Sequence, residues 1–229
     1  MSNAALFTLL QISDSIFPIG SYTQSNGLET YVQKNIVKDS ASAKKYLYNM
    51  LCYNIKYGDG LGMKLAYEAA LGKDIEYLQR IDNILHTSKG AKEIREGSLK
   101  LCLRFLKLIN KFDEKEAVLK YSELIKNGKC YGVYSIAFGI FAAESNISLD
   151  MALSAYIYNQ CSSIINNCAK LIPIGQMDGQ SILFNMQSTM EEVKKDIIGL
   201  SEEELGRCCP AFEIRAMQHE ELYSRLYMS

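Results

Sequence analysis

The sequence predicts an all-α protein, and three observations support this fold class. No proline lies between Pro18 and Pro173, so nothing in that span interrupts helical hydrogen bonding as proline does. Apolar residues recur there at spacings of three and four, which is typical of amphipathic helices. Apolar residues make up 48% and charged residues 22% of the 229 residues, which suits one folded core. We therefore expect a single-domain helical bundle of roughly ten helices over residues 1–229.

Charge and cysteine content exclude several function classes. The formal net charge is −1 and the basic residues are spread along the chain, so we expect no nucleic-acid partner. No apolar run reaches the roughly 20 residues that span a bilayer, and no basic signal-peptide segment precedes one. We expect a cytoplasmic protein with no membrane partner. The seven cysteines lack the close spacing of a zinc site, which predicts reduced, buried thiols.

The stretch DSIFPIGSYTQSNGLETY, residues 14–31, joins turn residues to the start of a helix. Pro18 favours an extended conformation at Phe17, and Gly20 allows a sharp turn. Ser21 can accept hydrogen bonds from the first free N–H groups of a helix, so we expect a helix from near Ser21 to near Lys34. The same pattern is also typical of an ordinary capped helix start, in which Ile16, Phe17 and Ile19 form an apolar plug, that is, side chains that pack into the core.

The following elements are justified by caps, glycines and periodicity. Asp39 with Ser40 predicts the next helix start, and the glycines at positions 58, 60 and 62 predict a bend in that helix. Gly72 stands where a helix C-cap glycine would. Residues 134–143 are apolar on every face, so we expect that helix at the centre of the bundle. The remaining helices are predicted over residues 74–85, 91–110, 114–126 and 148–172.

Cys161 and Cys168 lie seven residues apart on one face of the helix predicted over 148–172. Two thiols so placed could share a soft metal ion, but the isoleucines between them favour an ordinary core position. Pro173 ends this helix, and we expect Asp178 to cap the next one. Ser201, followed by three glutamates, predicts a further helix start.

The last residues after Pro210 combine apolar, aromatic and arginine side chains. Chain ends usually fray unless they dock on something. Side chains of this kind are typical anchors in protein interfaces, so we expect residues 211–229 to form a partner-docking tail.

Three separated strings resemble the UreF-type urease accessory proteins. The opening stretch is similar to the pattern D-x-x-F-P-x-G-x-x-x-x-S-x-G-L-E, and PIGQMDGQ at 173–180 is similar to P-x-G-Q-x-D-G-Q. The ending RAMQHEELYSRLYMS is similar to R-x-x-x-H-E-x-L-Y-S-R-L-F-x-S. A weaker central similarity lacks the family's histidine, because Val133 stands there. The motif residues are Phe17, Pro18, Gly20, Ser25, Gly27, Glu29, Pro173, Gly175, Gln176, Asp178, Gly179 and Gln180.

The resemblance implies a non-catalytic maturation chaperone and scaffold. Such a protein would form a homodimer, bind the UreD/UreH-type accessory protein and recruit the UreG-type GTPase, so that nickel enters the urease apoenzyme. It implies no tightly bound cofactor, with nickel at most in transit, and a tail that is poorly ordered or differently placed until its partner binds. The partner-binding residues that it implies are Arg215, His219, Glu220, Leu222, Tyr223, Arg225 and Leu226.

A helical-bundle metal-binding protein or metalloenzyme is the alternative. Inward Glu, His and Cys side chains would be its ligands, and His219, Cys208 and Cys209 are the metal candidates. Bundle enzymes of the di-iron type need Glu-x-x-His on two helices, and this chain has no such pair. A thiol-based metal store is a third interpretation. No phosphate-binding loop or zinc motif indicates catalysis.

Overall fold

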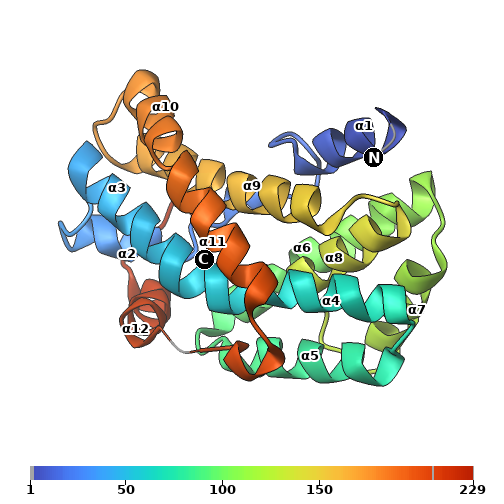
Figure 1. Ribbon diagram of the computed structural model, residues 1–229. Coiled ribbons are helices and arrows are strands. Elements are labelled where there is room, and N and C mark those ends of the chain that lie inside the picture. Colours follow the sequence, from blue (N-terminus) through green and yellow to red (C-terminus); the bar gives the residue numbers. More distant parts are fainter. Residues whose placement is uncertain (1–2, 208, 229) are drawn as a thin grey trace.

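The computed structural model describes residues 3–207 and 209–228, and this part of the chain contains helices and turns but no strand (Figure 1). The all-α prediction is confirmed. Shorter turns of helix cover Ser21–Thr23, Glu202–Glu204 and His219–Glu221, and a π-helix covers Met50–Gly60. The α-helices are α1 Asn3–Ser13, α2 Leu28–Gln33, α3 Ser40–Asn49, α4 Leu61–Gly72, α5 Ile75–Ser88, α6 Lys92–Phe112, α7 Glu116–Lys126, α8 Tyr134–Glu144, α9 Leu149–Leu171, α10 Gln176–Asn185, α11 Gln187–Gly199 and α12 Pro210–Gln218.

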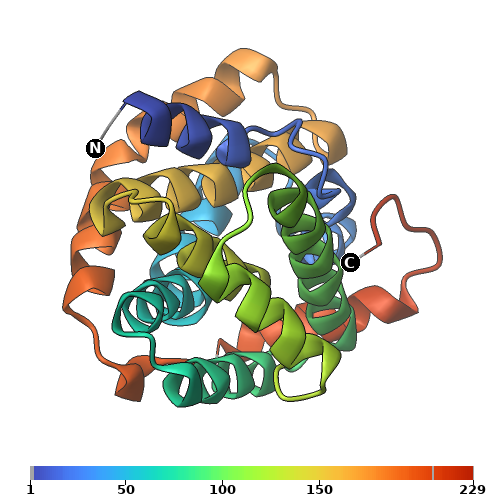
Figure 2. The ribbon, with the colours of Figure 1, turned by 90° about the vertical axis from the view of Figure 1, so that its right-hand side faces the viewer.

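Helix α8 lies at the centre of the bundle, with other helices around it (Figure 2). All of its residues from Tyr134 to Ala143 are buried, as their apolar character on every face predicts. Gly139 lets α4 approach closely, because a Cβ atom at this position would overlap the Met63 carbonyl oxygen. The close crossing of α4 and α8 therefore depends on the absence of a side chain at residue 139.

The apolar stripe of α9 is buried, and both of its cysteines are core residues. Cys161 and Cys168 are free and fully buried. Burial raises the pKa of each thiol to about 12, so both stay protonated at neutral pH. Since a thiol binds metal as the thiolate, this environment favours the core interpretation over a shared metal ion.

A cluster of aromatic rings joins the opening turn to α6 and α8. The Phe105 ring centroid lies 6.1 Å from that of Phe17, 5.6 Å from Tyr134 and 5.9 Å from Phe141. Of the predicted apolar plug, Phe17 and Ile19 are buried, at 6% and 4% exposure, whereas Ile16 is 84% exposed, so the prediction is wrong for that residue. These contacts fix the opening turn against α6.

A buried carboxylate holds the loop before α8. Asp82 has no exposed surface and accepts hydrogen bonds from the Tyr121 hydroxyl at 2.6 Å and from the Tyr131 N–H at 2.5 Å. The Gly132 and Val133 N–H groups donate at 3.2 and 3.3 Å to Oδ2, the oxygen that also accepts from the Tyr121 hydroxyl. Val133, the last residue before α8, is 1% exposed and thus a buried core residue.

Several predicted boundaries are confirmed. The Asp39 carboxylate accepts a hydrogen bond from the Ser42 N–H at 2.8 Å, and hydrogen bonds from Ser42 lower the pKa of Asp39. The bend predicted at the glycines is present, because Gly58 has φ −101° and ψ −110° inside the π-helix. Helix α2 ends at Gln33, next to the predicted Lys34.

Other boundaries are wrong, each for a local reason. Ser21 starts only a short 3₁₀ turn, and α2 begins at Leu28, because Asn26 and Gly27 have φ values of 52° and 80°. Gly72 is still helical, and Lys73 takes the left-handed conformation with φ 54°. Asp178 does not precede α10; it lies inside the first turn, where its carboxylate accepts the Gly175 N–H at 3.1 Å.

The predicted helix after Ser201 is also wrong, since Glu202–Glu204 forms only a 3₁₀ turn. Helices α1 and α11 were not separately predicted. The first lies within the N-terminal residues that carry no cap signal, and the second follows α10 after a single residue, Met186.

We predict that Gly20→Val lowers the free energy of unfolding by about 1 to 3 kcal/mol. Gly20 has φ 82°, and a Cβ atom there would overlap the Arg104 guanidinium. Thermal and urea unfolding measure the effect. Gly72→Ala is the matched control, because no atom lies within 4 Å of the added Cβ and alanine favours helix. Equal stability of Gly20→Val and the wild type would contradict the prediction.

Candidate partner-docking site

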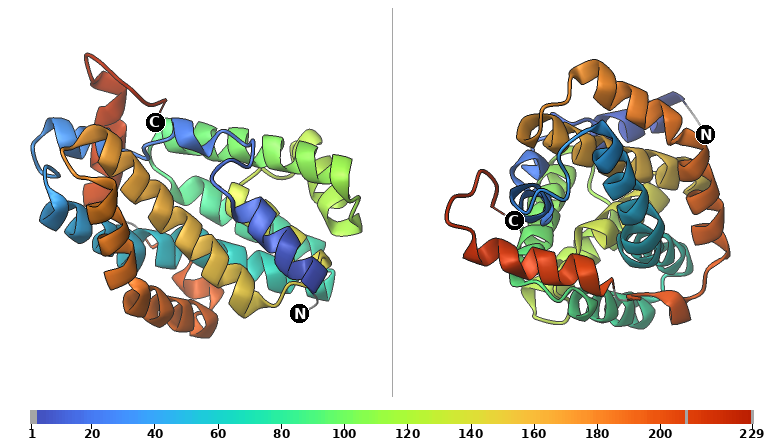
Figure 3. Two further views of the ribbon diagram at one scale, coloured as in Figure 1. Left: turned by 90° about the horizontal axis from the view of Figure 1, so that it is seen from above. Right: turned by 90° about the vertical axis from the view of Figure 1, so that its left-hand side faces the viewer.

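The opening stretch and the C-terminal tail, far apart in sequence, pack against each other. Gly27 at the start of α2 has φ 80°, and a Cβ atom on it would lie 3.1 Å from the Ala216 Cα of α12. The glycine is therefore needed both for its backbone conformation and for the close contact between α2 and α12. Beyond α12 the chain turns back towards residues 21–33, as the right-hand view of Figure 3 shows.

Glu29 on α2 is the first anchor of the tail. Its carboxylate accepts hydrogen bonds from the Leu226 N–H at 2.7 Å and the Tyr227 N–H at 3.2 Å. A third contact, at 3.1 Å, joins it to His219 Nε2. Glu29 is only 5% exposed, so these donors replace the water that a carboxylate would otherwise bind.

Glu93 on α6 is the second anchor. One carboxylate oxygen lies 2.6 Å from Arg225 Nη1, and the other lies 2.6 Å from His219 Nδ1. His219 has no exposed surface, and each of its ring nitrogens faces a different carboxylate. Both nitrogens can donate at once only when the ring is the imidazolium. We call Glu29, Glu93, His219 and Arg225 the tail clamp.

Backbone contacts complete the docking of the tail. The Gln33 side-chain amide donates to the Ser224 carbonyl at 2.9 Å, and the Met228 N–H donates to the Thr23 carbonyl at 2.9 Å. Tyr227, itself a residue of the tail, is buried, with 6% of its surface exposed. The described tail therefore lies against the chain's own helices. That the free tail is poorly ordered or differently placed until a partner binds stays a prediction. The sequence alone does not show that Glu29 and Glu93 both face the tail.

The predicted partner-binding residues divide into three groups by exposure. Tyr223, Arg225, Leu226 and Glu220 are exposed, and Tyr223 and Leu226 reach 105% and 67% exposure. His219 is buried in the tail clamp. Arg215 and Leu222 are half-buried, and Arg215 Nη1 donates to Gln218 Oε1 at 2.7 Å. The exposed group forms the outer surface of the tail, whereas His219 supports it from beneath.

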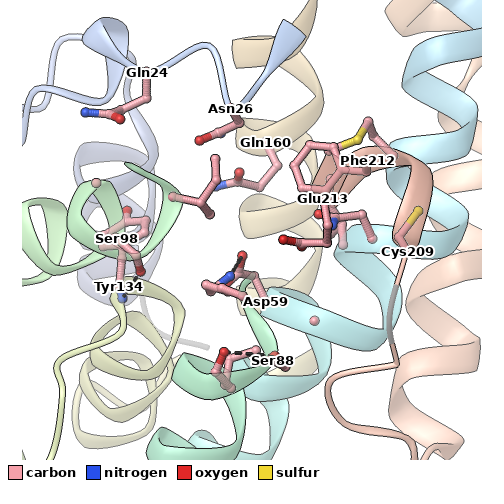
Figure 4. A pocket seen from close by; sticks show the side chains of 18 of the residues that line it. Gln24, Asn26, Asp59, Ser88, Ser98, Tyr134, Gln160, Cys209, Phe212 and Glu213 are labelled. Carbon is pink, nitrogen blue, oxygen red and sulfur yellow. Dashed lines mark hydrogen bonds and ion pairs between the residues drawn. The ribbon is translucent and has the colours of Figure 1, made fainter. Parts of the chain in front are cut away.

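A small polar cavity lies under α12 (Figure 4). Its volume is about 100 Å³, room for a few water molecules, and Gln24, Asp59, Gln160 and Glu213 are among its lining residues. Asp59 contacts Lys89 Nζ at 2.7 Å, and Glu213 accepts the Gly90 N–H at 2.7 Å. Both carboxylates are thus bound by groups of the protein itself, and the contact of Glu213 connects α12 to the rest of the bundle.

The motif string at 173–180 borders a larger groove. The groove has a volume of about 650 Å³ and is lined by the opening turn, polar residues of α9, and Ile174 and Gln176. Ile16 and Tyr22 at this groove are 84% and 66% exposed. The string at 173–180 and the opening stretch therefore both line the groove. The C-terminal tail instead contacts residues 23–33.

The metal candidates do not form a site in the described part of the chain. Among the described residues no three His, Cys, Asp or Glu side chains are grouped so that they could hold a metal ion. His219 faces one carboxylate on each ring nitrogen and so has no free nitrogen for a ligand bond. Cys209 is half-buried, and Cys208 lies outside the described residues. None of the described helices has the length and apolar character needed to cross a membrane.

These observations define an all-helical protein in which the tail clamp, a network of buried and partly buried side chains, holds a C-terminal segment at the surface. The UreF family model matches residues 37–187. The chain is 37% identical over 224 residues to the urease accessory protein UreF of Actinobacillus pleuropneumoniae serotype 5b, covering 98% of this chain and 99% of the relative. It is 38% identical to the protein of that name from Haemophilus influenzae, with coverage of 98% and 95%. The chain belongs to the UreF family.

Sequence reasoning missed Glu93 and Gln33 as partners of the tail. Glu93 opens α6 among other charged residues, which is typical of a solvated face. Nothing in the sequence around Glu93 indicates that His219 and Arg225, more than 120 residues away, pack against it. Glu29 was identified only as a motif residue; its burial between Leu28 and Thr30, both buried, was not anticipated.

We predict that Glu29→Ala loosens the tail. The change leaves His219 Nε2 and the N–H groups of Leu226 and Tyr227 without their carboxylate partner, and breaking such a buried network costs about 3 kcal/mol or more. Hydrogen exchange of the C-terminal peptide should become faster. Glu123→Ala, at an exposed position of α7, is the control. Unchanged exchange at Leu226 and Tyr227 would show that Glu29 does not hold the tail.

Proposed function

We propose that this protein is a non-catalytic scaffold in urease maturation. It acts as a homodimer in the cytoplasm, binds a UreD/UreH-type accessory protein and recruits a UreG-type GTPase, so that nickel reaches the urease apoenzyme. The observation that carries this proposal is the similarity to urease accessory proteins over 98% of the chain. The three motif strings fall within that range and lie on two adjoining surfaces, the tail and the groove.

The outer surface of the tail is the proposed docking site for the UreD/UreH-type partner. Tyr223 and Leu226 expose large apolar side chains next to Arg225, a combination that is typical of interface hot spots. The tail clamp fixes the backbone on the inner side, so the exposed side chains are presented with little loss of conformational freedom on binding. The proposal of a pre-organised tail therefore differs from the prediction of a tail that is poorly ordered or differently placed until its partner binds.

The exposed apolar residues at the groove support the homodimer. Ile16 and Tyr22 line the groove, and Met177, beside the lining residue Gln176, is 82% exposed. Large apolar side chains exposed near each other indicate an interaction surface. A second copy of the chain is the proposed occupant.

We predict that the purified protein is a homodimer and holds no stoichiometric nickel after dialysis. The first expectation follows from the family and the second from the absence of a grouped ligand set among the described residues. Light scattering gives the mass and elemental analysis gives the metal content. A monomer would contradict the dimer, and one nickel per chain would favour the metal-binding alternative.

We predict that Arg225→Ala weakens capture of the UreD/UreH-type partner by about 2 kcal/mol or more, and lowers urease activation in a reconstituted assay. Arg225 is partly exposed and is oriented by Glu93, so its remaining guanidinium donors can meet acceptors on the partner. The variant should keep the helical circular dichroism of the wild type, because Glu93 retains His219 as a partner.

Arg225→Lys separates binding from support of the tail. Lysine can still pair with Glu93 but lacks the planar guanidinium, so partner binding should be only partly restored while tail exchange stays at the wild-type rate. Full partner capture after deletion of residues 215–229 would refute the docking role.

A further inference from the structure

The exposed face of α6 carries a stripe of basic side chains. Lys100, Arg104, Lys107 and Lys111 are all exposed and follow one another at spacings of four, three and four. On an α-helix this spacing places them within about 60° of the circumference over about 16 Å. Between Glu96 and Asp113 the sequence has no acidic residue. We call these four residues the basic stripe.

The stripe is not neutralised within the described chain. None of its four residues forms an ion pair with a described carboxylate, whereas other lysines do, such as Lys56 with Asp196 at 2.7 Å. Like charges three and four residues apart destabilise a helix. Removing these four from the 25 basic residues leaves 21 against 26 acidic ones, so the stripe contrasts with the charge of the remaining chain.

The stripe continues the line of the tail clamp. Glu93 lies seven residues, or almost two turns, before Lys100, and therefore on the same face of α6. The tail covers this face at Glu93 through Arg225 and His219. Beyond it, Arg104 Nη1 donates to the Ile19 carbonyl of the opening turn at 3.1 Å, and a guanidinium has further N–H donors besides this one. Leu103, which flanks the stripe, is 48% exposed.

We infer that the partner docked on the tail carries an acidic segment that lies along α6 from Lys100 to Lys111. Carboxylates at helical spacing would match the four cations, and one apolar side chain of the segment would cover Leu103. The inference rests on the proposed docking of a UreD/UreH-type partner to the tail, and it names the charge pattern by which that partner is recognised. Complementary charge of this kind raises the association rate and fixes the register of two proteins.

The test compares two triple charge reversals in the full-length chain. Lys100→Glu with Lys107→Glu and Lys111→Glu reverses the stripe and keeps Arg104, which holds the opening turn. Lys38→Glu with Lys44→Glu and Lys45→Glu makes the same change at exposed lysines in and before α3. Both variants should remain folded. In the stripe variant the glutamates at positions 100 and 107 lie four and three residues from Arg104, so two of the three like-charge pairs along α6 become opposite-charge pairs and only the pair at 107 and 111 stays alike.

The probe is the purified UreD/UreH-type accessory protein, and the measurement is its association rate at about 50 and 200 mM NaCl. We expect the stripe variant to associate about tenfold more slowly at low salt, with a smaller difference at high salt, and the control to stay within about twofold of the wild type. Equal slowing of both variants, or wild-type rates for the stripe variant, would overturn the inference.

Deletion of residues 215–229 separates this inference from the proposed function. Loss of binding on deletion, together with a wild-type rate for the stripe variant, would leave the docking tail in place and reject the acidic segment. Normal binding on deletion would reject the docking tail itself. A stripe variant that loses only the UreG-type GTPase or only a DNA duplex would show that the occupant assigned here is wrong.

Discussion

The burial of two carboxylates, Glu29 and Glu93, is the constraint on which the placement of the tail depends. A carboxylate removed from water is stable only when donors replace the lost hydration. The donors come from the last residues of the chain: His219, Arg225 and the backbone N–H groups of Leu226 and Tyr227. The N-terminal motif and the C-terminal tail are therefore two halves of one network, and neither is satisfied alone.

The same network connects the buried core to the exposed outer surface of the tail, which is the proposed docking site. The aromatic contacts of Phe105 fix the opening turn against α6, and Gly27 allows α12 to lie on α2. The tail then presents Tyr223 and Leu226 outwards from a backbone that is held on its inner side. In the proposed scaffold role this arrangement would lower the entropy cost of partner binding, because the backbone of the tail is already placed.

Helix α6 connects the features that bear on function. Its first turns hold the tail through Glu93, its middle holds the opening turn through Arg104, and its buried face carries Phe105. The exposed cations on the same helix are then fixed relative to the tail, since both are attached to one rigid element. A partner that contacts the tail would meet the basic stripe in a defined register, which is how charge complementarity gives specificity.

The sequence by itself determined the all-α class, the central position of α8 and the core position of Cys161 and Cys168, because hydrophobic periodicity is a local property of the chain. It also gave the family resemblance that the comparisons confirm. It placed α2 at Ser21 instead of Leu28, since left-handed residues such as Asn26 are not visible in composition. Only the tertiary structure decided that Glu29 and Glu93 face His219, because contacts across more than 120 residues depend on how the helices pack and leave no periodic signal in the sequence.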